Sequence, residues 1–268
     1  SVGKLVPNVR STARILYLLY VILTLIMMIL LIFTGMHPFD AITITLGTAG
    51  TGGFGVLNDC CLSYTTLQQS IITIFMIAFG VNFNVYFLIY CKNFKDALKS
   101  EELRVYLGII LSAIVLISIN TFTMFPSLYE CIHHVAFTVG SIITTTGYAT
   151  VDFDLWPMFS KGILVLLMFI GACAGSTGGG LKVSRIVILI KSSLRELSNT
   201  VHPRHVKQIR FEGKMVEAGV VHGVERYLAM YLLIMIISIM LVSICNNDFT
   251  TNFTAVAATL NNIGPGLS

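Results

Sequence analysis

Long apolar runs are the feature that most constrains this chain. A helix needs about 20 mostly apolar residues to cross the hydrocarbon core of a membrane. Only 11% of the residues are charged, far below the roughly 25% of a soluble domain. The sequence therefore predicts an all-α polytopic membrane protein with spans at Ile15–Met36, Ser70–Tyr90, Val105–Phe125, Phe159–Ile190 and Tyr227–Cys245.

The basic residues indicate how these spans are oriented. When Ser1 is placed in the cytoplasm and the chain alternates across the spans, all of the 17 Lys and Arg residues except Lys161 fall on the cytoplasmic side. Lys and Arg favour that side of a membrane. We therefore expect a multi-pass protein of the cell (inner) membrane, with Ser1, Lys92–Arg104 and Lys191–Glu225 in the cytoplasm, and Gly55–Gln69 and Pro126–Met158 outside.

One order of segments recurs along the chain: a long apolar helix, a short amphipathic segment, a polar stretch that contains glycine, and another long helix. The short segments, Pro38–Leu46, Tyr129–Ser141 and Phe249–Leu260, cannot cross a membrane and have the length of re-entrant half-helices. Irregular backbone at membrane depth must be buried in protein or line a water-filled cavity. The order predicts repeated helix–pore half-helix–filter–helix units around a central ion pore, with boundaries at 1–100, 101–200 and, for an incomplete unit, 201–268.

The polar stretches follow the carboxyl ends of the half-helices, where partial negative charge favours cations. Backbone carbonyls can replace the hydration shell of a potassium ion, and glycine accepts the backbone angles that this requires. Gly53, Gly147 and Gly264 occupy the positions where these backbone angles are expected. The candidate filter residues are Thr51, Gly52, Gly53, Phe54, Thr145, Thr146, Gly147, Tyr148, Asn262, Ile263, Gly264 and Pro265.

These three stretches resemble the second, third and fourth selectivity-filter segments of the Trk/Ktr/HKT superfamily of potassium-uptake proteins. The ending Asn261-Asn262-Ile263-Gly264-Pro265-Gly266 resembles the bacterial Trk type more than the Ktr type. Members have four pore repeats in one chain, so the resemblance implies that this chain is truncated at both ends, without the first repeat and the last helix.

The resemblance also implies the function. We expect potassium uptake across the cell membrane through a gated, channel-like selective pore, with potassium as substrate and only metal, no cofactor and no enzymatic activity. The implied partners are membrane lipid, a second copy in a homodimer and a cytoplasmic nucleotide-binding regulatory subunit, without nucleic acid. Carriers also use broken helices around midplane sites, so a secondary carrier coupling potassium to sodium or protons is the alternative.

A second glycine cluster, Gly171–Gly180, interrupts the fourth span. Glycine costs a helix about 1 kcal/mol relative to alanine, so the helix should break there. A phosphate-binding loop requires Lys where this chain has Leu181, and no strand precedes the cluster. In the superfamily a loop of this kind lies beneath the filter as a gate, a role that the resemblance implies for Gly175, Ser176, Thr177, Gly178, Gly179 and Gly180.

Several polar residues have two interpretations. Asn82 and Asn84 in the second span either mark an ion pathway or bond to a neighbouring helix. His133 and His134 are adjacent, and adjacent positions do not face one another on a helix, which favours packing or hydrogen bonding over a metal pair. The basic loop 191–225 contacts either anionic lipid or the regulatory subunit.

Overall fold

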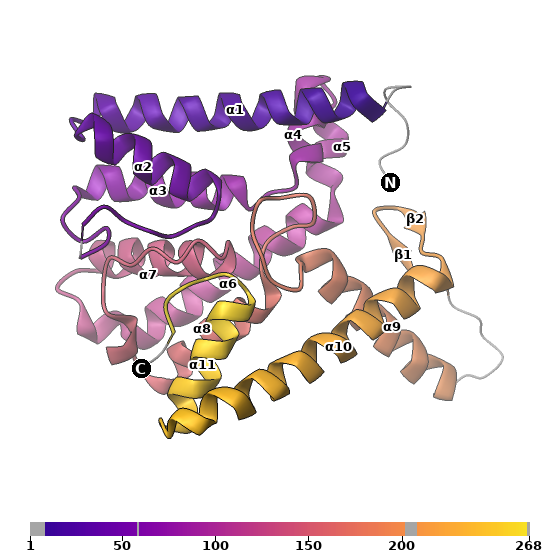
Figure 1. The fold of residues 1–268 in the computed structure, drawn as a ribbon. Coiled ribbons are helices and arrows are strands. Elements are labelled where there is room, and N and C mark those ends of the chain that lie inside the picture. Colours follow the sequence, from indigo (N-terminus) through magenta and orange to yellow (C-terminus); the bar gives the residue numbers. More distant parts are fainter. Residues whose placement is uncertain (1–8, 58, 202–207, 267–268) are drawn as a thin grey trace.

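The protein is folded almost entirely into helices (Figure 1), as the sequence predicts. The computed structural model describes residues 9–57, 59–201 and 208–266. Within that part of the chain, three helices are long and apolar enough to cross a membrane: α1 (Val9–Phe33), α6 (Glu101–Thr121) and α10 (Ala218–Val242). Ser1 and the basic residues among 202–207, which contribute to the predicted orientation, lie outside the described residues.

Three half-helices occupy the predicted re-entrant positions, and each begins at a residue that favours a helix start. α2 (Pro38–Ala49) has proline in its first turn, where the missing N–H needs no partner. The Ser127 hydroxyl caps α7 (Leu128–Ile143), and the Asp248 carboxylate caps α11 (Phe249–Leu260). Local sequence therefore fixes where the half-helices begin.

The second predicted span, Ser70–Tyr90, is not one helix. It is divided into α3 (Thr66–Phe79) and α4 (Phe83–Tyr90), which meet at an angle of 91°. The expectation of a continuous span is wrong because Gly80 ends α3 and the Asn82 side chain caps the start of α4. Backbone groups released at this bend have partners in the loop at residues 171–182, which we call the glycine loop.

The fourth predicted span is broken at the glycine loop. α8 (Met158–Ile170) ends before the loop and α9 (Val183–Val201) begins after it. The remaining elements are α5 (Phe94–Lys99), the 3-10 turns η1 (Phe122–Met124), η2 (Phe153–Leu155) and η3 (Ser243–Cys245), and an antiparallel hairpin of β1 (Arg210–Phe211) and β2 (Lys214–Met215). The sequence does not predict this hairpin.

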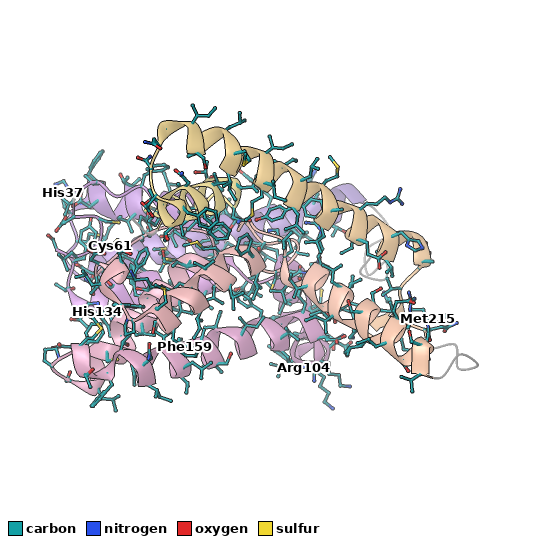
Figure 2. All side chains as sticks on the ribbon, turned by 90° about the horizontal axis from the view of Figure 1, so that it is seen from below. His37, Cys61, Arg104, His134, Phe159 and Met215 are labelled. Atoms are coloured by element: carbon teal, nitrogen blue, oxygen red, sulfur yellow. The ribbon has the colours of Figure 1, made fainter. Side chains whose placement is uncertain are left out.

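The ends of the elements are sorted onto two sides of the molecule. Figure 1 shows the start of α1, α5 and the β1–β2 hairpin at one end, with the α1–α2 turn at the other. Figure 2 separates His37, Cys61 and His134 from Arg104 and Met215 in the same way. These two ends carry the segments that the charge pattern assigns to the outside and to the cytoplasm.

Apolar side chains fill the interior and also cover much of the exterior. Tyr106, Ile142 and Leu164 are buried between α6, α7 and α8. By contrast, only 11% of the most apolar window is buried in α1, and the same share in α10. An apolar helix surface that is left uncovered belongs in hydrocarbon rather than water, so α1 and α10 present a lipid-compatible face.

Candidate functional site

The three candidate filter segments have the same backbone conformation. In each segment, the second and the fourth residues after the half-helix have positive φ angles, which side chains ordinarily disfavour. The second residues are Thr51, Thr145 and Asn262 (φ 50°, 58° and 58°), and the fourth are Gly53, Gly147 and Gly264 (φ 70°, 90° and 103°). The segments are therefore in register, and the left-handed threonines are a feature that sequence reasoning missed.

Hydrogen bonds within each half-helix explain this shared turn. The N–H of the third residue after the helix bonds to a carbonyl five residues back, which is the Schellman pattern of helix ends. The three bonds run from Gly52 N to Gly47 O (2.7 Å), from Thr146 N to Ser141 O (2.9 Å) and from Ile263 N to Ala258 O (2.8 Å). The hydrogen bonds at the carboxyl end of each half-helix thus determine the backbone conformation of the segment that follows it.

The segments lie next to one another in chain order. A Cβ added to Gly53 would lie 1.8 Å from the carbonyl oxygen of Thr146, and one added to Gly147 would lie 1.8 Å from that of Ile263. A Cβ on Gly264 would meet nothing within 4 Å among the described residues. The glycines of the first and second segments therefore touch the backbone carbonyl of the next segment.

The last position of each segment differs between repeats. Tyr148 is 1% exposed, whereas Phe54 is 82% exposed. The Tyr148 hydroxyl donates to Ile44 O (3.2 Å), and the Tyr148 carbonyl accepts from Ser141 Oγ (2.6 Å). Tyr148 therefore fastens the second segment to α2, while the Phe54 side chain is not brought into the cluster.

The glycine loop touches all three segments. Gly179 N donates to Thr145 Oγ1 (2.5 Å), and Thr51 Oγ1 donates to Thr177 O (3.2 Å). A Cβ on Gly179 would lie 2.4 Å from the carbonyl oxygen of Asn261, and one on Gly178 would lie 2.8 Å from that of Thr144. Glycine is required here because the loop backbone lies directly against the ends of the half-helices.

The loop is also bonded to the bend between α3 and α4. Cys173 N donates to Gly80 O (3.0 Å), and Phe83 N donates to Gly175 O (3.1 Å). Both broken spans thus satisfy each other's free backbone groups, as irregular backbone at membrane depth requires. Sequence reasoning missed both the helix end at Gly80 and these two hydrogen bonds. The sequence signal that could have indicated the bend is a glycine two residues before an asparagine that caps the next helix.

Two basic residues follow the loop. Lys182 Nζ donates to the carbonyl of Gly178 inside the loop. The Arg185 guanidinium donates to Leu181 O (3.2 Å) and lies 4.2 Å from the ring centre of Tyr227 on α10. These contacts place one cation against the loop backbone and tie the start of α9 to α10.

Three of the polar residues with two interpretations, Asn82, His133 and His134, bond to neighbouring segments of the chain. Asn82 Nδ2 donates to Glu102 Oε2 on α6 (3.1 Å). His133 Nε2 lies 2.8 Å from Gln69 Oε1, and His134 Nδ1 lies 3.0 Å from Thr150 Oγ1. The histidines have separate partners, and no group of three His, Cys, Asp or Glu among the described residues could hold a metal ion.

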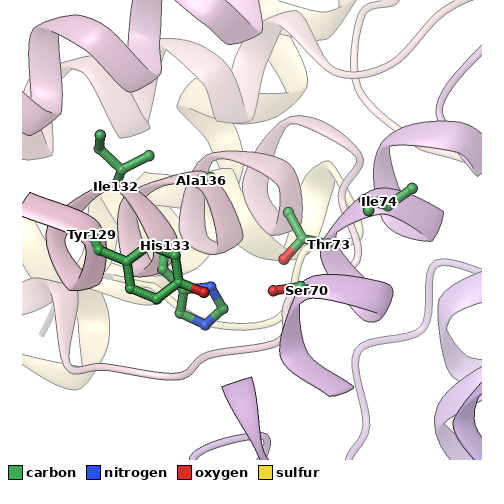
Figure 3. Close-up of a pocket in the computed structure, with 7 residues that line it drawn as sticks. All are labelled: Ser70, Thr73, Ile74, Tyr129, Ile132, His133 and Ala136. Carbon is green, nitrogen blue, oxygen red and sulfur yellow. The ribbon is translucent and has the colours of Figure 1, made fainter. Parts of the chain in front are cut away.

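His133 also lines a groove of about 210 Å³ between α3 and α7 (Figure 3). The groove is open to the surface, and its rim includes the exposed side chains Ile74, Tyr129 and Ile132. Exposed apolar side chains on a membrane helix are those expected to meet lipid. The groove belongs to the outer surface of the helix pair.

Comparison with known proteins decides the family. A family described as "TrkH: Cation transport protein" matches residues 2–268. The chain belongs to the TrkH family. This is a family of cation transport proteins, not of enzymes, and the all-α membrane fold predicted from the sequence is confirmed by a TrkH structure.

Several relatives cover nearly the whole chain. The Trk system potassium uptake protein TrkH of Escherichia coli is 35% identical over 99% of this chain, which is 56% of the relative's length. TrkG of the same organism is 31% identical over 98% of the chain and 55% of its own length. The crystal structure of the potassium transporter TrkH from Vibrio parahaemolyticus matches with a TM-score of 0.91 and 32% identity, over 99% of this chain and 58% of that one. This TrkH-family chain thus spans about half the length of its relatives.

Proposed function

We propose that this chain forms part of a protein that takes up potassium through a gated, channel-like pore in the cell membrane. The filter would be residues 51–54, 145–148 and 262–265, and the gate residues 175–180. The pore units would be residues 1–100, 101–200 and 201–268. The observation that carries the proposal is the identical turn after three half-helices, with one glycine-rich loop in contact with all three turns.

The physical argument concerns the carbonyl groups. Three helix carboxyl ends directed at one place supply partial negative charge, and positive φ at alternate residues turns successive peptides in a repeated way. Carbonyl oxygens held in this manner can replace water around a dehydrated cation. Relatives above 30% identity are named as potassium uptake proteins, which favours potassium as the cation.

The orientation and partners form part of the same proposal. The end that carries the hairpin and α5 would face the cytoplasm, because Lys and Arg gather there, and the membrane would be the inner one. The relatives are named as parts of a "Trk system", in keeping with a regulatory subunit of the nucleotide-binding kind on that face. A homodimer in membrane lipid completes the proposed assembly.

Potassium-limited growth and current measurements test this function. The full-length gene product should restore growth of a strain that lacks potassium uptake, and its current should reverse at the potassium equilibrium potential. Uptake that requires a sodium or proton gradient would instead favour the coupled carrier. Absence of potassium flux from well-expressed protein in the membrane would overturn the proposal.

A further inference from the structure

Glu102, in the first turn of α6, is a buried carboxylate that neither the filter nor the gate contains. Its side chain is 3% exposed, and burying a charge is costly unless hydrogen bonds compensate. Glu102 Oε1 accepts from Ala174 N (2.6 Å) and Ser184 N (3.2 Å), and Oε2 accepts from Asn82 Nδ2 (3.1 Å). All three donors belong to segments far from Glu102 in the sequence.

These three donors lie before the proposed gate residues, after them, and at the bend that packs against them. Ala174 precedes residues 175–180, Ser184 follows them in the first turn of α9, and Asn82 lies at the bend between α3 and α4. The carboxylate also lies at the amino ends of α6 and α9, where helix dipoles favour negative charge. One side chain therefore holds the chain on both sides of residues 175–180 and the bend against which the glycine loop packs.

The β1–β2 hairpin reaches the same place from the other side. Glu212, between the two strands, accepts through Oε1 from Ser100 Oγ (2.8 Å) and from the backbone N of Glu102 (2.9 Å). Lys191 Nζ on α9 lies 2.5 Å from Glu101 Oε1 and donates to Arg210 O of β1 (2.7 Å). The hairpin, the start of α6 and α9 are thus joined around residue 102.

We propose that Glu102 is a positioning residue that holds the chain on both sides of residues 175–180, and that the β1–β2 hairpin is coupled to the glycine loop through Glu212. Movement of the hairpin would shift the start of α6, and with it the carboxylate to which the loop backbone is bonded. This inference rests on the proposed gating role of residues 175–180. It gives an otherwise unassigned hairpin a mechanical connection to that loop.

Removal of the anchor should free the loop. Glu102→Ala leaves Ala174 N and Ser184 N without their acceptor, so rubidium flux through the full-length gene product should rise about tenfold, the factor that loss of one charge-assisted hydrogen bond can produce in an equilibrium. Glu102→Gln keeps an amide oxygen as acceptor, and flux should return most of the way to that of the parent. The ratio of potassium to sodium permeability should not change.

Glu212→Ala tests the coupling with an exposed residue, so that the fold is retained even where Glu102→Ala is poorly expressed. Flux should rise roughly threefold, since one of the contacts that fix the start of α6 is lost. Glu217→Ala is the matched control, because Glu217 is also exposed and lies just after β2, where its side chain makes no capping hydrogen bond to α10. The double variant Glu102→Ala/Glu212→Ala should exceed Glu102→Ala little, as expected for residues acting through one contact network.

A second measurement separates this inference from the proposed function. Ser176→Cys places a thiol in the loop, and its modification from the cytoplasmic side should quicken when Glu102→Ala or Glu212→Ala is added. If the parent carries no rubidium yet the thiol responds, the proposed function fails and the anchor stands. If the parent conducts but neither flux nor modification responds, or Glu212→Ala behaves as Glu217→Ala does, the inference is wrong.

Discussion

The proposed filter segments and the glycine loop both contain glycine and irregular backbone, yet their conformations have different origins. Each filter segment is set by a Schellman bond to its own half-helix, and this arrangement is repeated three times. The glycine loop is bonded instead to distant elements, including the α3–α4 bend, the filter threonines and Glu102. A local turn tolerates little change within it, whereas a loop held by its neighbours can be displaced by a change in any of them.

This difference predicts different consequences for transport. Substitutions inside a filter turn should alter which ion is preferred, because they move carbonyl ligands. Changes to the glycine loop or its anchors should alter how much ion passes, because they shift an equilibrium between positions of the loop. We expect the largest effect from a change in a filter turn, smaller effects from changes to the loop and its contacts, and the smallest from labelling that tests the orientation.

Gly147→Ser should have the largest effect. A side chain there meets the Ile263 carbonyl oxygen at 1.8 Å and must adopt a φ of 90°. The left-handed conformation alone costs on the order of 1–2 kcal/mol, and the displaced carbonyl also stops serving as a ligand. The permeability ratio of potassium to sodium should fall about tenfold, which corresponds to about 1.4 kcal/mol.

Gly162→Ser is the matched control for this substitution. Gly162 lies within α8, and a Cβ there meets nothing within 4 Å among the described residues. At equal membrane expression it should retain both the parent's permeability ratio and its growth on limiting potassium. If Gly147→Ser also retains that ratio, residues 145–148 are not the filter.

Shortening residues 175–180 should raise ion flux without changing ion preference. Deleting Gly178 and Gly179 removes the backbone that lies against Thr144 and Asn261. We expect a rise in rubidium flux of roughly fivefold, which corresponds to about 1 kcal/mol of lost stabilisation of the closed position. Unchanged flux would exclude the gating role, and a changed permeability ratio would show that the loop also selects.

Thr145→Val tests the difference between the filter turn and the glycine loop at a residue that contributes to both. The backbone of Thr145 belongs to the filter turn, but its hydroxyl accepts the hydrogen bond from Gly179 N of the loop. Valine keeps the shape and removes that acceptor, so flux should rise about threefold, in keeping with loss of a hydrogen bond worth about 0.7 kcal/mol. Thr43→Val is the control: it removes a hydroxyl that bonds to Phe39 O within α2, and it should not change flux. A changed permeability ratio in Thr145→Val would contradict the separate roles of the filter turn and the glycine loop.

Labelling of Cys60 should affect transport least, and it tests which end of the molecule faces outside. A hydrogen bond from Cys61 and another from Ala149 N lower the pKa of the Cys60 thiol to about 6. Because the reactive thiolate exists above this pKa, labelling by an impermeant maleimide from outside should slow about tenfold between pH 7 and pH 5. Cys91 is exposed and lies between α4 and α5, and α5 is at the opposite end of the molecule; labelling of Cys91 from outside would contradict the orientation.

The repeated parts of this fold could be predicted because their determinants are local. Apolar length identifies α1, α6 and α10, capping residues such as Ser127 and Asp248 mark the half-helix starts, and glycines recur at one offset after the half-helices. The glycines thus mark candidate filter positions in the sequence. The exposure of Phe54 could not be predicted in this way, because burial of an aromatic ring at this position depends on contacts with distant elements, such as the bond of the Tyr148 hydroxyl to α2.

The parts that the sequence did not predict depend on partners far along the chain. The bend at Gly80–Asn82 is stabilised by the glycine loop, which lies some 90 residues later. Glu102 reads as an ordinary acidic residue at a helix start, and only the tertiary fold places Ala174 N and Ser184 N around it. Short apolar windows cannot reveal such long-range hydrogen bonds, because neither of the two bonded segments has a distinctive sequence pattern by itself.

If the three turns form the filter, they hold a dehydrated cation. Crystals of the full-length gene product soaked in thallium or rubidium, both of which give anomalous scattering, test it most directly. We expect an anomalous peak bounded by residues 51–54, 145–148 and 262–265, at carbonyl oxygens such as those of Thr146 and Ile263, each of which adjoins the glycine of the preceding segment. Ion density found only elsewhere, with these turns in the same conformation, would show that the three turns are not the cation site.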